Sequence, residues 1–166
     1  MVNNEYLLQK IQGFLGTDLL IHEEPFELLT IVISKNRNVD LLQYLYNDEE
    51  LKFQFLTDVC GAHYPDQKDN ELSVIYHLHS FTNNIRLRVK CYLPVSEPSI
   101  KTATTVFKGA NWQERETYDF YGIIFEGHPN LKRIINVDEM DYFPQRKEYP
   151  LEDGTRTDKD DKYFGR

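Results

Sequence analysis

The sequence predicts a two-layer α+β domain, in which helices cover one face of a mixed, mainly antiparallel β-sheet. Two observations carry this prediction: apolar residues recur at helical spacing in two segments, and apolar and polar residues alternate in the segments around them. The chain of 166 residues also has the size of one domain, able to bury roughly 70% of the surface that its unfolded form exposes. We expect the order helix, two strands, helix, three strands, followed by a short helical region and an extended C-terminal tail.

Two amphipathic helices are expected in the first third of the chain. The first has Asn3 or Asn4 available as N-cap and Gly16 just past its end. The second follows the first two strands. The apolar stripes that indicate them are Leu7, Leu8, Ile11, Phe14 and Leu15 in the first helix, and Val39, Leu41, Leu42, Leu45 and Tyr46 in the second.

Three short strands are expected around the second helix. Residues 18–22 and 27–34 are separated by turn-forming residues that include Pro25, and residues 52–57 alternate between apolar and polar side chains. These strands supply part of the sheet on which the helices pack.

Residues 71–81 and 85–93 form the clearest unit, a β-hairpin. Asn83 and Asn84 between them suit the positive φ angles of a two-residue type I′ turn. That turn would pair Leu78 with Val89, Tyr76 with Cys91 and Val74 with Leu93 on a buried face, and His79 with Arg88 and His77 with Lys90 on a solvated face.

The next forty residues are expected to be helical. Pro98 and Ser99 open a short helical stretch to about Phe107, and a second helix covers residues 112–121. Its signals, in chain order, are a capping box of Asn111 and Glu114, an i,i+4 ion pair of Arg115 and Asp119, and a C-terminal cap at Gly122.

The C-terminal tail differs in composition, since 15 of the 31 residues in 136–166 are charged. Ordering a backbone costs roughly 1 to 2 kcal/mol per residue, against roughly 1.5 to 3 kcal/mol for each large side chain buried. We therefore expect this tail to be disordered in the isolated chain and to become ordered on a partner. The expected divisions are an α+β domain over 1–93, a helical region packed on it over 94–135, and a partner-binding tail. The tail's apolar anchors are Val137, Met140, Tyr142, Phe143, Tyr149, Leu151, Tyr163 and Phe164.

Charge and composition exclude several classes of protein. The 27 acidic residues outnumber the 19 basic ones, and the net charge of -8 has the wrong sign for binding nucleic acid. Cys60 and Cys91 are too few for a disulfide scaffold or an iron–sulfur cluster, which favours a reducing, cytoplasmic setting. The most apolar run, residues 28–33, is far shorter than the about 20 residues of a membrane-spanning helix. The first residues also lack the pattern of a secretory signal, so we expect a cytoplasmic protein.

Cofactor and metal motifs are weak or missing in the sequence. It contains no Gly-x-Gly-x-x-Gly and no Gly-Lys-Ser/Thr loop, the usual phosphate cradles for NAD, flavin or ATP. Cys60 and His63 form half of a zinc pattern, for which a loop or core role is favoured. His77 and His79 share a strand face, but the basic residues opposite them would repel a cation, which favours a solvated face.

Catalytic arrangements are equally poorly supported. No Gly-x-Ser-x-Gly nucleophile elbow is present. Glu114 and Glu116 could be an acid and base pair, but two positions on a helix point about 200° apart. Glu116 is thus left as a candidate for contacts outside its helix.

A family resemblance rests on two linked stretches. Residues 110–123, ANWQERETYDFYGI, are followed by residues 127–135, GHPNLKRII. Together they resemble the signature of one subunit, designated C, of the bacterial proton-pumping NADH:quinone oxidoreductase, respiratory complex I. The resemblance covers most of residues 50–151. Two departures stand out: His63 replaces a usual aspartate, and residues 142–148 read YFPQRKE where GHPLRKD is common.

The resemblance implies a cofactor-free structural subunit of the peripheral arm, on the cytoplasmic face of the bacterial inner membrane. In that family the subunit packs against a large neighbour, designated D, which shapes the quinone cavity and which we call the quinone-cavity subunit. It supports electron transfer from NADH to quinone coupled to proton translocation, and it would hold no catalytic, cofactor or metal residue. The residues that we expect to serve assembly are Trp112, Glu114, Arg115, Glu116, Asp119, Tyr121, His128, Pro129, Arg133, Tyr149, Pro150, Tyr163 and Phe164.

Two alternatives remain at this point. One is the equivalent subunit of a hydrogenase-type or ferredoxin-driven relative of complex I. The other is a free-standing enzyme that uses Glu114, Glu116 or His128.

Overall fold

The computed structural model describes residues 2–149. Four short 3-10 helices accompany three α-helices and seven strands in this part of the chain. The helices are α1 (Asn4–Leu15), α2 (Asn38–Asn47) and α3 (Ala110–Tyr121), and the strands are β1 (Leu19–Glu23), β2 (Thr30–Ile33), β3 (Phe55–His63), β4 (Leu72–Ser80), β5 (Ile85–Leu93), β6 (Ser99–Lys101) and β7 (Ile124–Glu126).

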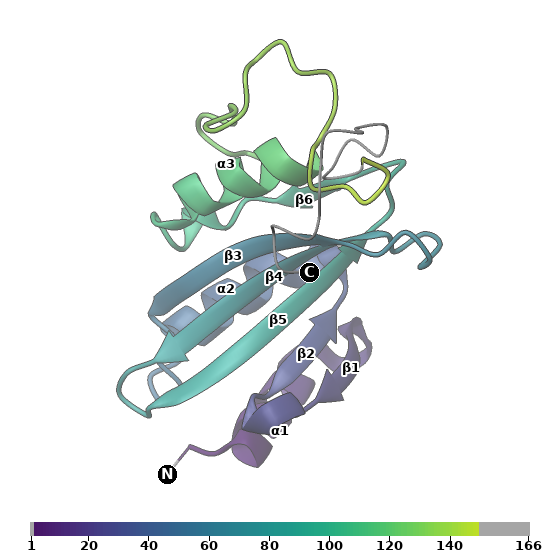
Figure 1. The fold of residues 1–166 in the computed structure, drawn as a ribbon. Coiled ribbons are helices and arrows are strands. Elements are labelled where there is room, and N and C mark those ends of the chain that lie inside the picture. Colours follow the sequence, from purple (N-terminus) through teal and green to yellow (C-terminus); the bar gives the residue numbers. More distant parts are fainter. Residues whose placement is uncertain (1, 150–166) are drawn as a thin grey trace, which may run out of the picture.

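The main sheet has five strands in the order β1-β2-β5-β4-β3. Only the pair β2 and β5 is parallel, and the other three pairs are antiparallel. The expected mixed, mainly antiparallel α+β fold is therefore confirmed (Figure 1).

One face of this sheet forms the core. Val74, Tyr76 and Leu78 of β4 are buried on it, while the residues between them lie on the opposite face. Leu7 and Ile11 of α1 belong to the same buried cluster, as do the leucines of α2. Figure 1 shows α2 behind β3, β4 and β5. The helices thus cover the face that the alternation of the strands leaves apolar.

The first helix follows its local signals. The Asn3 side chain accepts a hydrogen bond from the Tyr6 N–H at 2.9 Å, and the helix ends at Gly16 with φ 56°. N-cap and C-cap are therefore as expected, because both depend on neighbouring residues alone.

The strand bounds differ from those expected. The third strand begins at Phe55, later than position 52, and continues to His63. Lys52 has a φ of 48°, a left-handed conformation that a strand cannot include. The second strand is limited to Thr30–Ile33, since a 3-10 turn occupies Pro25–Glu27.

The hairpin keeps its predicted faces but not its predicted register. Leu78 pairs with Leu87 and Tyr76 with Val89, two residues away from the expected partners. Four residues, 81–84, connect the strands in place of the expected two. The Asn83 side chain donates to the Glu50 and Leu51 carbonyls at 2.7 and 3.1 Å, so this residue holds the preceding loop and does not take the left-handed conformation of a type I′ turn.

Residues 99–101 were expected to be helical and are a strand. β6 pairs in parallel with β7, so the strands that precede and follow α3 lie side by side. Asn38 of α2 donates to the Lys101 carbonyl at 2.7 Å and to the Tyr76 hydroxyl at 3.2 Å, joining this small sheet to the main one. Long-range pairing has overridden the local helical pattern.

Among residues 2–149, no helix is both long and apolar enough to cross a membrane.

Candidate assembly interface

The helix of the sequence signature, α3, lies along the edge strand β3. The Thr117 hydroxyl donates to the Val59 carbonyl at 3.5 Å, and the ring of Tyr121 lies against Gly61. A Cβ atom at Gly61 would be 2.5 Å from Tyr121 Cδ2, so only glycine permits this close approach. The Tyr121 ring is thus partly buried against residues of this chain.

Glu114 does not form the expected capping box. Its carboxylate is fully buried and accepts hydrogen bonds from the Thr102 hydroxyl at 2.5 Å and the Ala103 N–H at 2.6 Å. Burial raises the pKa of this carboxyl to about 7, against the lowering effect of the two hydrogen bonds. Glu114 therefore joins α3 to the segment after β6. Thr102 and Ala103 compete with the helix N-terminus for the Glu114 carboxylate.

His128 lies beside this carboxylate, with its Nε2 atom 4.0 Å from Glu114 Oε2 and its side chain buried. Its Nδ1 atom accepts a hydrogen bond from the Asn130 N–H at 3.0 Å, so the ring proton is assigned to Nε2. That N–H donates to the Asn111 carbonyl at 3.0 Å. Both ring nitrogens are engaged in fixing the loop after β7.

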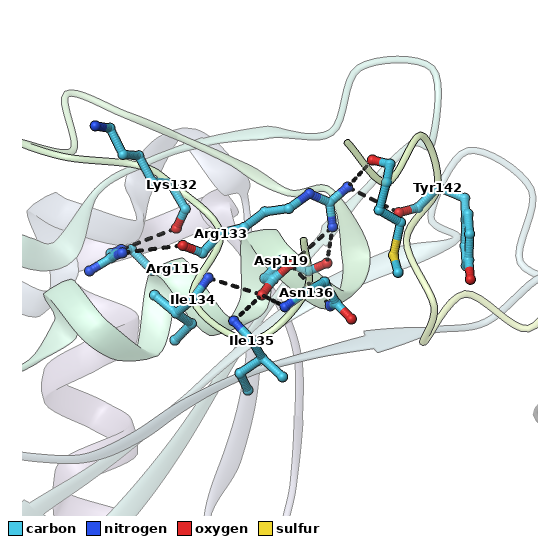
Figure 2. Close-up of polar contacts among 9 residues, drawn as sticks. Arg115, Asp119, Lys132, Arg133, Ile134, Ile135, Asn136 and Tyr142 are labelled. Carbon is cyan, nitrogen blue, oxygen red and sulfur yellow. Dashed lines mark hydrogen bonds and ion pairs between the residues drawn. The ribbon is translucent and has the colours of Figure 1, made fainter. Parts of the chain in front are cut away.

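Asp119 gathers the segment that follows β7 (Figure 2). Its Oδ2 atom accepts from the N–H groups of Ile134, Ile135 and Asn136 at 2.8 to 3.1 Å. Its Oδ1 atom pairs with the Arg133 guanidinium at 2.9 Å. Burial alone would raise the pKa of this carboxyl, but the hydrogen bonds from Asn136, Ile135 and Ile134 outweigh it and hold the pKa well below its usual range.

Arg115 does not form the expected pair with Asp119. It donates instead to the carbonyls of Lys132 and Arg133, at 3.1 and 3.3 Å (Figure 2). Its guanidinium carbon lies 4.6 Å from the centroid of the Trp112 ring, which remains 64% exposed. The i,i+4 pair does not form because both residues bind the segment after β7 instead. Arg115 binds backbone carbonyls there, and Asp119 binds backbone N–H groups and Arg133.

Arg133 extends the network toward the tail. Its Nη2 atom donates to the carbonyls of Met140 and Tyr142 at 2.9 and 3.0 Å. The Phe143 ring contacts both Arg133 and Arg146, whose guanidinium carbons are 5.0 and 4.9 Å from its centroid. Cation–π contacts thus hold an aromatic anchor of the tail within the chain.

The beginning of the tail is fastened by backbone contacts. The Arg146 side chain donates to the Tyr121 carbonyl at 2.8 Å, and the Gln145 N–H donates to the Phe120 carbonyl at 3.2 Å. The Lys147 N–H donates to the Nδ1 atom of buried His63 at 2.9 Å. Counting apolar anchors alone missed these polar contacts, which join residues 145–147 to α3 and β3 within the chain. The expectation that the tail becomes ordered on a partner stays a prediction.

The structure divides the sequence-predicted assembly residues by exposure. Glu114, Asp119 and the side chains of His128 and Arg133 are buried, and Arg115 and Tyr121 are partly buried. Trp112, Glu116, Pro129 and Tyr149 are exposed. The remaining three predicted residues, Pro150, Tyr163 and Phe164, lie outside the described residues.

Exposed apolar side chains are concentrated in one stretch of the sequence. Six of the eleven large apolar side chains exposed among residues 2–149 belong to residues 112–149: Trp112, Ile124, Ile135, Val137, Tyr142 and Tyr149. Sequence reasoning named two of the six for assembly and two more as tail anchors, but it missed Ile124 and Ile135. We call this set the α3 surface; its aromatic and aliphatic composition is typical of an interface core.

A cluster of metal-ligating residue types on the other face of the sheet has unfavourable chemistry. Asp58, Cys60 and His77 bring their ligand atoms within 4.8 Å of one another. However, burial and then Asp58 raise the pKa of Cys60 to about 11, which keeps the thiol protonated. His77 Nε2 accepts a hydrogen bond from Arg88 Nε at 3.0 Å, so a cation there would face a guanidinium. His63 of the half zinc pattern is held by Lys147.

Comparison with known proteins identifies a family. A family model described as the 30 kDa subunit of respiratory-chain NADH dehydrogenase matches residues 31–155. A curated NADH-quinone oxidoreductase subunit, also designated C, from Nocardioides sp. is 48% identical over 118 residues, covering 69% of this chain and 47% of that protein. Its counterpart from Methylobacterium radiotolerans is 38% identical over 145 residues, covering 87% and 66%. The chain therefore spans about half to two thirds of the length of these relatives.

Solved structures share the fold. A trypsin-resistant fragment of Nqo5 is 30% identical, with a TM-score of 0.64, covering 76% of this chain and 98% of the fragment. A chain of an archaeal membrane-bound sulfane sulfur reductase has a TM-score of 0.74 over 89% of this chain and 85% of its own. Its 19% identity makes it a likeness of fold alone.

Proposed function

The chain belongs to the family of the 30 kDa subunit of respiratory-chain NADH dehydrogenase, and we propose from this membership that it is a structural subunit of the peripheral arm of an NADH:quinone oxidoreductase. In this role the chain supports the complex that transfers electrons from NADH to quinone and translocates protons. The chain itself performs neither step. The electron carriers reside in neighbouring subunits.

The single observation that carries this proposal is how the signature helix uses its charged groups. Glu114 and Asp119 are both fully buried, and each accepts hydrogen bonds from backbone N–H groups of segments outside α3. Arg115 and Arg133 donate to backbone carbonyls. A catalytic acid or base needs access to a substrate. Glu114 instead fixes the segment after β6, and the other three groups fix the path of residues 132–142, which is the work of a scaffold.

We propose the α3 surface as the contact with the quinone-cavity subunit. Trp112 with Arg115 stacked on it resembles an interface anchor, since tryptophan and arginine are enriched among residues that dominate binding energy. The exposed carboxylate of Glu116 lies on the same helix and is available to a basic partner. The buried network below this surface keeps it in one shape before binding, which lowers the entropic cost of association.

The chain is proposed to bind no cofactor or metal of its own. The high pKa of Cys60 and the hydrogen bonds already made by His63 and His77 support this, because thiolate and free imidazole nitrogen are what a metal ion requires. We further place the assembled complex at the cytoplasmic face of a bacterial inner membrane, with this chain attached only through other subunits.

The test is purification of the complex through this chain. An affinity tag on the full chain in its native cells, followed by mild detergent extraction of membranes, should recover the quinone-cavity subunit and the cluster-bearing subunits with NADH:quinone activity. A strain lacking the chain should lose that activity. Recovery of a complex that oxidises reduced ferredoxin but not NADH would favour the donor-driven relative, and recovery of the chain alone would contradict an assembly role.

A further inference from the structure

The face of the main sheet away from the helices carries a groove near the turn between β4 and β5. Phe55 lies opposite His79, and His79 opposite Arg86, in the register of the three strands. These residues alternate with the core residues of their strands and so point away from the core. The groove encloses about 490 Å³. In Figure 1 this face of β3, β4 and β5 is turned to the viewer, with α2 behind it.

Two phenylalanines form one wall of this groove. Phe55 and Phe81 have ring centroids 5.0 Å apart, and the His79 ring lies 4.5 Å from that of Phe81. Despite this contact, Phe55 is 44% and Phe81 68% exposed. An aromatic cluster that remains open to water on an otherwise polar face is typical of a binding surface.

The other wall is basic. Arg86 and Arg88 line the groove, and no carboxylate of the described residues does. Within residues 2–149 neither arginine pairs with a carboxylate, and the one hydrogen bond of the Arg88 guanidinium is to His77. That bond places the ring proton of His77 on Nδ1, which is buried and has no hydrogen-bond partner in the described part of the chain. The groove thus offers two guanidinium groups, with their hydrogen-bond donors and positive charge, on a protein whose net charge is -8.

A second hollow, of about 680 Å³, continues from the same two arginines toward Phe26. Phe26 is fully exposed and has a φ of 55°, a left-handed conformation that is unfavourable for an L-residue with a side chain. Among residues 2–149, Glu27 is the one carboxylate that lines this hollow, and it forms no ion pair with either arginine. Aromatic rings therefore lie at both ends of the surface, with the arginines between them.

We propose that these two hollows, which we call the arginine groove, bind an extended acidic segment of another protein of the same assembly. Its carboxylates would lie between Arg86 and Arg88, and its apolar side chains would pack on Phe55 and Phe81. Charge complementarity favours this occupant, because carboxylates would lie beside Arg86 and Arg88. A second copy of this chain is disfavoured, because two molecules of net charge -8 repel each other. The inference rests on the proposed function in one respect, that the chain works inside an assembly, but it uses a different face from the α3 surface.

The experiment is site-specific photocrosslinking in the assembled complex. A benzoylphenylalanine at position 81 of the full chain probes the arginine groove, and the same residue at position 137 probes the α3 surface. We expect position 81 to capture an acid-rich segment of another subunit, identified by mass spectrometry. Arg86→Glu should lower the yield of that crosslink about tenfold, and Lys substitutions of the captured acids should restore it. Lys68→Glu, an exposed lysine elsewhere, is the matched control and should change nothing.

Several outcomes would overturn the inference: no protein captured at position 81, capture of a second copy or of residues 150–166, or a yield unchanged by Arg86→Glu. Arg86→Gln, which removes the charge without reversing it, replaces Arg86→Glu if the latter chain does not fold. A crosslink to the quinone-cavity subunit from position 137 with none from position 81 would reject this inference alone. The absence of any crosslink from positions 81 and 137, in a complex that lacks the quinone-cavity subunit, would reject the proposed function.

Discussion

Asp119 and Arg133, fourteen positions apart, form an ion pair of 2.9 Å that is buried inside the chain. Arg133 also donates to the Asp119 backbone carbonyl at 3.1 Å, so the pair is fixed from two sides. Because Asp119 holds three successive backbone N–H groups and Arg133 holds two later carbonyls, this contact sets the path of the chain from α3 to the tail.

Replacing Asp119 with Asn should destabilise the chain by about 3 kcal/mol, since the substitution leaves the buried Arg133 charge without its partner. Denaturant unfolding of the purified chain measures this change. Hydrogen exchange should show lost protection at the amides of Ile134, Ile135 and Asn136. Glu116→Gln, at an exposed position on the same helix, should change stability by less than about 0.5 kcal/mol. Equal effects of the two variants would contradict the role given to Asp119.

The Asp119 carboxyl also makes stability depend on acid. Its folded-state pKa is lowered, so its contribution is fully present above the unfolded-state pKa of 3.8 and is lost as the pH falls toward the folded value. Unfolding measured between pH 5 and pH 2.5 should show a steep loss for the wild-type chain. The loss should be shallower in Asp119→Asn, and an identical slope would show that other groups dominate.

Glu114 should act in the opposite direction and in another pH range. Its folded-state pKa of about 7 exceeds the unfolded-state value of 4.5, so its effect favours folding below pH 4.5 and is lost as the pH rises through 7. From this group the wild-type chain should be more stable at pH 5 than at pH 8, by up to about 3 kcal/mol. Glu114→Gln should remove that component. A chain whose stability does not fall from pH 5 to pH 8, with no difference in Glu114→Gln, would contradict the prediction.

Whether the sequence could predict a feature of this structure depends on how far apart in the chain the residues that determine the feature lie. The caps of α1 and the C-terminal cap at Gly122 depend on adjacent residues, and they are as expected. The alternation that separates Tyr76 from His77 also survives, because one face of the sheet must be buried. Fold class follows from these local and periodic signals.

Contacts across long separations could not be predicted. The register of the hairpin depends on Asn83 reaching back to residues 50 and 51, a contact without any local pattern. The capping box and the i,i+4 pair were both plausible within α3. Both fail because Thr102 and Arg133, distant in sequence, provide buried partners for Glu114 and Asp119. The sequence held one sign that Glu114 is buried: this capping-type acid lies on the apolar face of its helix.

Gly61 and Gly13 should respond oppositely to the same substitution. Gly61→Ala places a methyl group 2.5 Å from Tyr121 Cδ2 and should cost about 1 to 3 kcal/mol by displacing α3 from β3. The double variant Gly61→Ala with Tyr121→Ala should lose less stability than the sum of the two single variants, because the clash is absent from it. Gly13→Ala in α1 meets nothing within 4 Å and should stabilise the chain by about 0.5 to 1 kcal/mol. Thermal or denaturant unfolding measures all three, and a neutral Gly61→Ala would mean that α3 can shift freely.

Arg115→Ala should lower the amount of assembled complex without lowering turnover per complex. The substitution removes two charged hydrogen bonds to the Lys132 and Arg133 carbonyls and frees the Trp112 ring that the guanidinium orients. Because hydrogen bonds from charged groups contribute roughly 1.5 to 3 kcal/mol, the α3 surface should lose its fixed shape while the main sheet stays folded. Native gels of detergent-extracted membranes measure assembly, NADH:quinone activity per complex measures turnover, and Arg115→Lys, which keeps the charge but not the forked geometry, should lie between wild type and alanine. Intact assembly with vanished turnover would instead assign Arg115 a direct part in the chemistry.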